Sequence, residues 1–273
     1  MMVFFATRGL LTKSLDPVLE NNSWADIAEA ASLGIAPWSP GDTKSFVLNG
    51  QVGNTSFSNL ELQAFILGIN HNAALEGDNL IHFGIAMLDG TLVALCDAQY
   101  GTSQSGNGYF NMNPNNSNSG GWKDSYHRLA LLGNSGTPAR PPANSLLAAL
   151  PADLRAVMKP VTKYSDNTGG GSNTASYVTS TTDYLFELSE FEYHGARTYA
   201  NSAEQNYQQQ YAYYQAGNSK VHYKHNATGT AALVACRSVN AAGSASFCLL
   251  SSNGNANYAD AANSWGVAPG FAV

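Results

Sequence analysis

The sequence predicts one α+β domain with unusually long loops. Apolar runs typical of strands are interleaved with segments of helical spacing, without the regular alternation of a doubly wound parallel sheet. Two stretches rich in Gly, Asn and Ser, residues 100–122 and 165–176, carry too little apolar surface to bury a regular backbone. The 273 residues are 44% hydrophobic and 11% aromatic, which is enough for a substantial core.

The N-terminal third predicts a helix followed by strands. Ser23 is a helix-capping residue with Asp26 three positions later, so a short helix is expected from Trp24 to Leu33, ending at Gly34. The apolar run Phe46–Leu48 precedes Asn49-Gly50, which predicts a strand entering a tight hairpin turn.

Further strands are expected over residues 60–71 and 82–98, the latter a pair joined at Asp89-Gly90. Helical spacing over residues 146–157 is interrupted by Pro151, which suits the first turn of a second short helix. Residues 183–195 indicate a strand and a turn. A helix capped by Gly217 is expected from Ser202 to Ala216.

The core is expected to come from large apolar residues in these elements. The predicted core positions are Ile66, Ile81, Ile85, Leu95, Leu150, Leu154, Phe186, Phe247 and Phe271.

Charge and composition exclude several classes of function. Only 12% of residues are charged and the net charge is −6, with no Lys/Arg cluster of the kind that binds nucleic acid. No window approaches the ~20 apolar residues of a membrane span. The first 17 residues lack a basic region and a small-residue cleavage site, so synthesis in the cytoplasm without a signal peptide is expected. The three cysteines, Cys96, Cys236 and Cys248, are expected to be free thiols, with a Cys236–Cys248 bond as the alternative.

Catalytic signals are weak throughout the chain. His222 and His225 could ligate a metal, but strand geometry would point them to opposite faces, so solvent-facing histidines are expected. The acidic residues Asp183, Glu187, Glu190 and Glu192 could bind a hard cation, although capping and surface solvation are favoured. Tyrosines 207, 211 and 214 have helical spacing and predict a face packed on the sheet rather than a sugar-stacking platform. We therefore expect no catalytic residue, no metal and no cofactor.

The C-terminal segment has an unusual composition. Residues 229–273 contain no Lys, Glu, Gln or Met, whereas the first 228 residues contain 29 of them, a rate that predicts about six. Buried strands would exclude long polar side chains, but residues 251–264 are too polar for a core. Codons of the form AAY, randomised at their adenines, encode residues such as Asn, Ser, Asp, Gly, Ala and Tyr, but never Lys, Glu, Gln, Met or Trp. The segment matches this set except at Trp265, which is then either a fixed anchor or evidence against the idea.

Several motifs carry a resemblance to a known family. These are "GGWKDSYHR" (120–128), "LPADLRAVMKPV" (150–161), "DYLFELSEFEYHGAR" (183–197), "CRS" (236–238) and the terminal "GVAPGFAV". From about Trp24 to its end, the chain resembles prophage and gut-bacterial proteins with a C-type-lectin-like (formylglycine-generating-enzyme-like) domain, among them the variable proteins of diversity-generating retroelements. Related sequences carry a Trp-Trp pair before the Arg-Ser and an Arg at the place of Ala268; this chain lacks both.

The resemblance implies a division into a leader or attachment segment, residues 1–20, and a ligand-binding domain, residues 21–273, with a variable region at about 229–273. It implies a non-enzymatic receptor-binding protein of a phage or prophage tail, used on a virion or cell surface. Its partner would be a cell-surface protein or glycan, and its assembly a homo-oligomer or a tail-fibre scaffold. The variable binding face would contain Leu233, Val234, Cys236, Asn240, Ala241, Ala242, Ser246, Leu249, Ser251, Ala259, Asp260 and Trp265.

Two alternatives stay open. One is a carbohydrate-binding adhesin of fixed specificity. The other is an oxidase of the formylglycine-generating type, for which Cys236 and Cys248 would be the cysteine pair.

Overall fold

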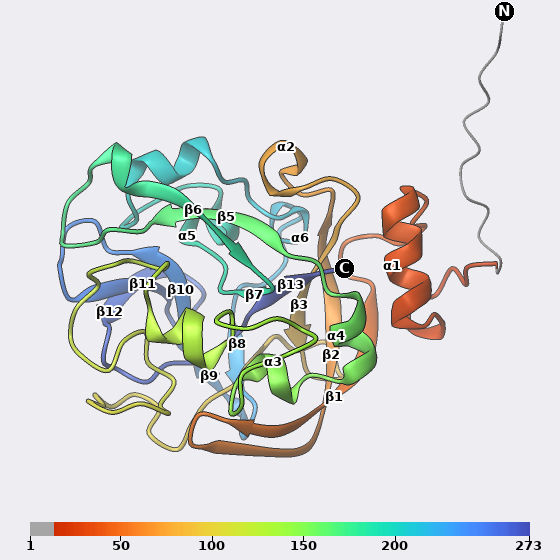
Figure 1. Ribbon diagram of the computed structural model, residues 1–273, viewed down its shortest axis with the longest axis horizontal. Helices are drawn as coiled ribbons and strands as arrows, with labels where there is room; N and C mark the ends of the chain where they lie inside the picture. The colour runs from red at the N-terminus through yellow and green to blue at the C-terminus, as the bar shows by residue number, and fades with distance from the viewer. Residues whose placement is uncertain (1–13) are drawn as a thin grey trace, which may run out of the picture.

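The computed structural model describes residues 14–273, so most of the predicted leader lies outside the described residues. The architecture is α+β, with short helices packed around small, mostly antiparallel sheets (Figure 1). A five-stranded sheet has the strand order β1-β2-β3-β13-β7. Its strands are β1 (Thr43–Val52), β2 (Thr55–Ile69), β3 (Ile81–Ala86), β13 (Gly270–Ala272) and β7 (Leu185–Phe186). The last strand of the chain therefore lies between β3 and β7, in the sheet that the first strands begin.

Three smaller sheets complete the structure. They are β10 (Val234–Val239), β11 (Ser246–Leu250) and β12 (Ala256–Asp260); β4 (Val93–Ala94), β8 (His222–Lys224) and β9 (Ala227–Ala232); and β5 (Val161–Asp166) with β6 (Val178–Asp183). The β4–β8 pair is parallel. In Figure 1 the β10–β12 sheet lies on the side of the molecule opposite α1 (Trp24–Leu33).

Helix α1 has the predicted bounds. The Ser23 side chain accepts a hydrogen bond from the Asp26 N–H, and the Asp26 carboxylate accepts one from the Ser23 N–H, which completes a capping box. Gly34 ends the helix in the left-handed conformation at φ 66°. The buried face of α1 includes Trp24, whose ring packs edge-on against Phe83 at 5.5 Å between centroids.

The first hairpin turns later than predicted. The turn is Gly53-Asn54, not Asn49-Gly50, because a register shift between Leu48 and Gly50 lets β1 continue to Val52. Gly53 has φ +52°, and a Cβ there would lie 2.3 Å from the Gly108 carbonyl oxygen. The turn is thus selected by its close contact with the long loop 100–122.

The expected helix from Ser202 to Ala216 is wrong. The segment contains only a 3₁₀ turn, η4 (Ser202–Asn206), and one helical turn, α6 (Ala212–Gln215). The helix is interrupted between them, where the Gln208 side chain donates to the Tyr164 carbonyl and the Tyr211 N–H, at an extended residue, donates to the Glu192 carbonyl. Tertiary hydrogen bonds here outweigh helix propensity.

All nine predicted core positions are buried in one hydrophobic cluster. The remaining helical segments are short: η1 (Leu19–Asn21), α2 (Ala73–Glu76), the π-helical turn η2 (His127–Leu131), α3 (Leu146–Ala149), α4 (Ala152–Val157), η3 (Ala175–Tyr177) and α5 (Glu190–His194). Pro151 directly precedes α4, which agrees with its predicted role. Among the described residues, none of the helices has the length and apolarity needed to cross a membrane.

Candidate functional site

The predicted face residues divide into two groups. Ala242 and Asp260 are exposed, and Leu233, Ser251, Ala259 and Trp265 are half-buried. The other six are buried, which corrects their assignment to an exposed face: Val234, Cys236, Asn240, Ala241, Ser246 and Leu249. Four of the six lie on β10 and β11, both faces of which are covered, with β11 as the central strand of its sheet. Asn240 and Ala241 follow β10, and their backbone N–H groups donate to the carbonyls of Ser246 and Tyr199.

The exposed part of the C-terminal segment is concentrated on β12 and its flanking turns. Tyr258 is 46% exposed, although no sequence pattern distinguishes it from its neighbours. Its ring packs edge-on against Tyr199, with 4.9 Å between centroids. Asp260 lies two residues farther, on the same side of the strand, and its carboxylate accepts a hydrogen bond from Asn116 Nδ2 at 2.9 Å. We call β12, Tyr199 and loops 113–119, 168–173 and 242–245 the binding face.

A single buried asparagine joins three of these loops. Asn118 is fully buried, and its Nδ2 donates to the carbonyls of Gly243 and Ser246 at 2.7 and 2.9 Å. Its Oδ1 accepts from the Gly170 N–H at 2.8 Å. The glycine- and asparagine-rich loop 100–122 is therefore an ordered structural part of the face and not a free linker.

Buried carboxylates shape the other loops. Glu190 accepts hydrogen bonds from the backbone N–H groups of Thr198, Tyr199 and Ala200 at 2.8–3.1 Å. These bonds fix the position of Tyr199 beside Tyr258. Asp166 accepts from two N–H groups in the loop after β5, those of residues 168 and 169, at 3.0 and 2.8 Å.

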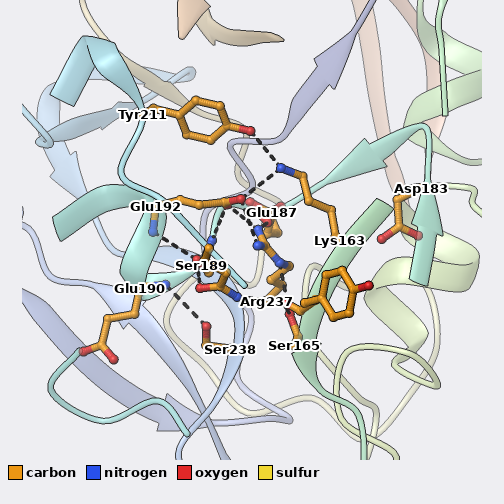
Figure 2. Close-up of polar contacts among 12 residues, drawn as sticks. Lys163, Ser165, Asp183, Glu187, Ser189, Glu190, Glu192, Tyr211, Arg237 and Ser238 are labelled. Atoms are coloured by element: carbon orange, nitrogen blue, oxygen red, sulfur yellow. Dashed lines mark hydrogen bonds and ion pairs between the residues drawn. The ribbon is translucent and has the colours of Figure 1, made fainter. Parts of the chain in front are cut away.

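A buried ionic centre is made by residues of α5, β10, β5 and α2 and the residue before α6, namely Glu192, Arg237, Lys163, Glu76 and Tyr211 (Figure 2 shows all but Glu76 labelled). Arg237 forms a two-pronged ion pair with Glu192, one contact of which, Nη2 to Oε1, is 2.9 Å. Lys163 Nζ lies 2.9 Å from Glu192 Oε1, 2.5 Å from Glu76 Oε2 and 2.9 Å from the Tyr211 hydroxyl. Each carboxylate is thus neutralised by at least one buried cation.

The pKa values in this centre follow from the pairing. Burial opposes ionisation of Glu192, but Arg237 and Lys163 outweigh it and hold its pKa well below the usual value. Burial likewise opposes ionisation of Glu76, yet Lys163 lowers its pKa to about 2. Both carboxylates are therefore ionised at neutral pH.

The expected surface solvation of the acidic group around residue 190 is wrong, since all four members are buried. Capping is confirmed for Glu192, which completes a capping box with Ser189. Asp183 accepts from Arg128 Nε at 2.6 Å and from Trp122 Nε1 at 2.9 Å, and Glu187 contacts His127 Nε2 at 2.9 Å. The sequence could not reveal these partners because they come from residues more than 50 positions away.

One set of side chains has the composition of a metal site. Ligand atoms of His71, Glu76 and Glu192 lie within 4.8 Å of one another. However, the Lys163 ammonium already bonds to both carboxylates, so this donor set holds a cation supplied by the chain itself. Burial lowers the pKa of His71 to about 3. We read the set as part of the ionic centre.

The predicted solvent exposure of His222 and His225 is also incorrect in part. His222 is buried, and burial lowers its pKa to about 4. His225 is half-buried and its Nδ1 accepts from the Cys96 N–H at 3.1 Å. The three cysteines are free, as predicted, and all are buried. Burial raises the pKa of Cys96 to about 12 and those of Cys236 and Cys248 well above the usual value, which suppresses thiolate formation.

A family model, "Domain of unknown function (DUF6273)", matches residues 100–273. The chain belongs to the DUF6273 family. The DUF6273 segment begins at the long loop and includes every element of the binding face, together with Lys163, Glu192 and Arg237 of the ionic centre. Comparison with the curated proteins gives no match. Comparison with the solved structures gives no match either.

Proposed function

We propose that this DUF6273 chain is a non-enzymatic binding protein that presents the binding face to a protein or glycan on a cell surface. We further propose a C-type-lectin-like fold and membership of the variable proteins of diversity-generating retroelements, acting at a phage or prophage tail. In this proposal, residues of β12 and of its flanking turns vary while the fold beneath them is constant.

One observation carries the proposal: the groups that shape the face are separate from the residues that it exposes. Asn118 and Glu190, which fix the loops, are buried and precede the segment lacking Lys, Glu, Gln and Met. The residues exposed within that segment are small, polar or Tyr, as in antibody paratopes. Side chains of the face can therefore change without removing the contacts that hold the loops.

Trp265, which the AAY codon set cannot encode, is consistent with a fixed anchor. Its ring packs edge-on to Tyr100 at 6.0 Å between centroids, and its backbone N–H donates to the Phe110 carbonyl at 2.9 Å. The residue thereby attaches the C-terminal segment to the long loop. This contact supports its exclusion from the variable set.

A fixed-specificity carbohydrate-binding adhesin is the second candidate. The half-exposed Tyr258 ring, with the Asp260 carboxylate and the Asn116 amide nearby, combines an apolar surface with polar groups of the kind that orient small ligands. The same residues would carry both functions, so the two candidates differ in diversification and not in the position of the site.

Sequencing the encoding locus tests the proposal. We expect a near-identical copy of roughly the last 150 bases beside a reverse-transcriptase gene, differing at adenines. Differences restricted to codons of exposed residues of the face, with none at the codons of Arg237 or Trp265, would support it. A locus without such a copy would overturn diversification, and a glycan array with one sharp hit would then favour the adhesin.

A further inference from the structure

Strand β12 is an open sheet edge within the binding face. The sheet ends at β12, and across the described residues its only strand partner is β11. All five residues from Ala256 to Asp260 are exposed or half-buried. The strand contains no Lys or Pro, the residues that commonly protect edges from pairing.

Two flanking hydrogen bonds determine which backbone N–H and C=O groups of β12 point toward β11. The Ser251 N–H donates to the Asn255 carbonyl, and the Ala261 N–H donates to the Ala245 carbonyl, both at 2.8 Å. Hydrogen-bonded and non-bonded pairs alternate along an antiparallel ladder.

It follows that the main-chain groups of Asn257 and Ala259 face β11, whereas those of Ala256 and Tyr258 face the open side. The Tyr258 N–H agrees with this assignment, because it donates to the side-chain Oδ1 of Asn257 at 2.9 Å. A side-chain amide that caps an edge N–H can rotate away when a better-aligned backbone carbonyl arrives.

We propose that the partner of this protein is another protein, and that an extended segment of that partner adds to β12 as a fourth strand. The inference rests on the proposed binding function and names its ligand class. A polypeptide backbone supplies alternating donors and acceptors at the spacing of Ala256 and Tyr258, which a sugar does not. Such bonds do not depend on side-chain identity, so the backbone contribution to affinity persists while the side chains of the face change and adjust specificity. The exposed Asp260 carboxylate at the end of the strand selects a Lys or Arg in the added segment.

Proline substitutions separate backbone from side-chain binding. Proline removes one N–H, and at Ala256 or Tyr258 that N–H lies outside the β10–β12 ladder. Random linear peptides displayed on phage are selected against the immobilised full chain, and enriched peptides are synthesised for calorimetry. We expect Ala256→Pro and Tyr258→Pro each to raise the Kd of these peptides about tenfold, whereas the control variant Leu88→Ala, at an exposed residue outside the binding face, leaves it unchanged.

A second measurement covers the case in which the proline variants misfold. Enriched peptides are N-methylated at one backbone position at a time. Strand addition predicts loss of binding at every second position. Equal tolerance at all positions would overturn the proposal.

The remaining outcomes distinguish this inference from the proposed function. Binding that survives both proline variants but is lost in Tyr258→Ala or Asp260→Ala overturns strand addition and leaves the binding face intact. Peptides whose Kd is unchanged by the two proline and the two alanine substitutions would overturn both strand addition and the proposed binding face. A dimer in light scattering that becomes a monomer in Ala256→Pro would show that a second copy covers the edge, which also overturns the inference.

Discussion

The ionic centre and the binding face lie close together and are built on opposite principles. The ionic centre places Glu76, Lys163, Glu192 and Arg237 in complete burial, where each group depends on its partner. The binding face exposes mostly small polar side chains, together with Tyr258 and Asp260. Buried charges tolerate few substitutions because an unpaired ion in a low dielectric is costly, whereas exposed small residues tolerate many. The buried contacts that hold the fold are thus separate from the residues exposed on the binding face.

The largest expected effect is in the ionic centre. Arg237→Met leaves Glu192 buried beside Lys163 alone, and we expect a loss of about 3–5 kcal/mol in the free energy of unfolding. Urea denaturation measures it, with the exposed Arg140→Met as the control. Equal urea midpoints for Arg237→Met and Arg140→Met would contradict the expectation that substitutions in the ionic centre cost more stability than substitutions at the surface.

Acid should lower the free energy of unfolding, because His222 is neutral in the folded protein and protonates more easily in the unfolded chain. Its pKa is about 6.5 in the unfolded chain and about 4 in the folded protein, so the folded state favours the neutral ring. Stability is therefore highest above pH 6.5 and falls as the pH drops toward 4, by about 2–3 kcal/mol between pH 7 and 4.5. Denaturation of the wild type and of His222→Asn at both pH values should show that the variant loses less.

Asn118→Ala tests the contact that joins three loops of the binding face. It leaves the carbonyls of Gly243 and Ser246 and the Gly170 N–H without their partner, so we expect a loss of about 1–3 kcal/mol. Faster amide hydrogen exchange should be confined to the loops around residues 118, 170 and 243. Unchanged hydrogen exchange in these loops would show that Asn118 does not hold them together.

The smallest effect on stability is expected at the face itself. Tyr258→Ala and Asp260→Ala should each change the free energy of unfolding by no more than about 0.5 kcal/mol and yet abolish or strongly weaken ligand binding. Leu88→Ala is the matched control, since Leu88 is 49% exposed and lies in the turn after β3. Parallel loss of folding and binding would mean that the face is not independent of the fold.

The local and the apolar features could be predicted from the amino-acid sequence. The helix from Trp24 to Leu33 is specified by its capping residues, and the nine core positions by size and apolarity, because these signals lie in neighbouring residues. Composition also identified residues 229–273 as unusual. Half of the predicted face residues proved to be buried, however, since strand alternation does not reveal that β11 is central in its sheet.

Which polar residues are buried and which are exposed depends on the tertiary structure. Glu192 meets Arg237 and Lys163, and Asn118 meets Gly243, across separations of 29 to 125 residues. An isolated acidic or amide residue is hydrophilic in any sequence pattern, so its burial depends on partners that folding brings from elsewhere. The same holds for Tyr258, which is exposed because its strand is the last in the sheet.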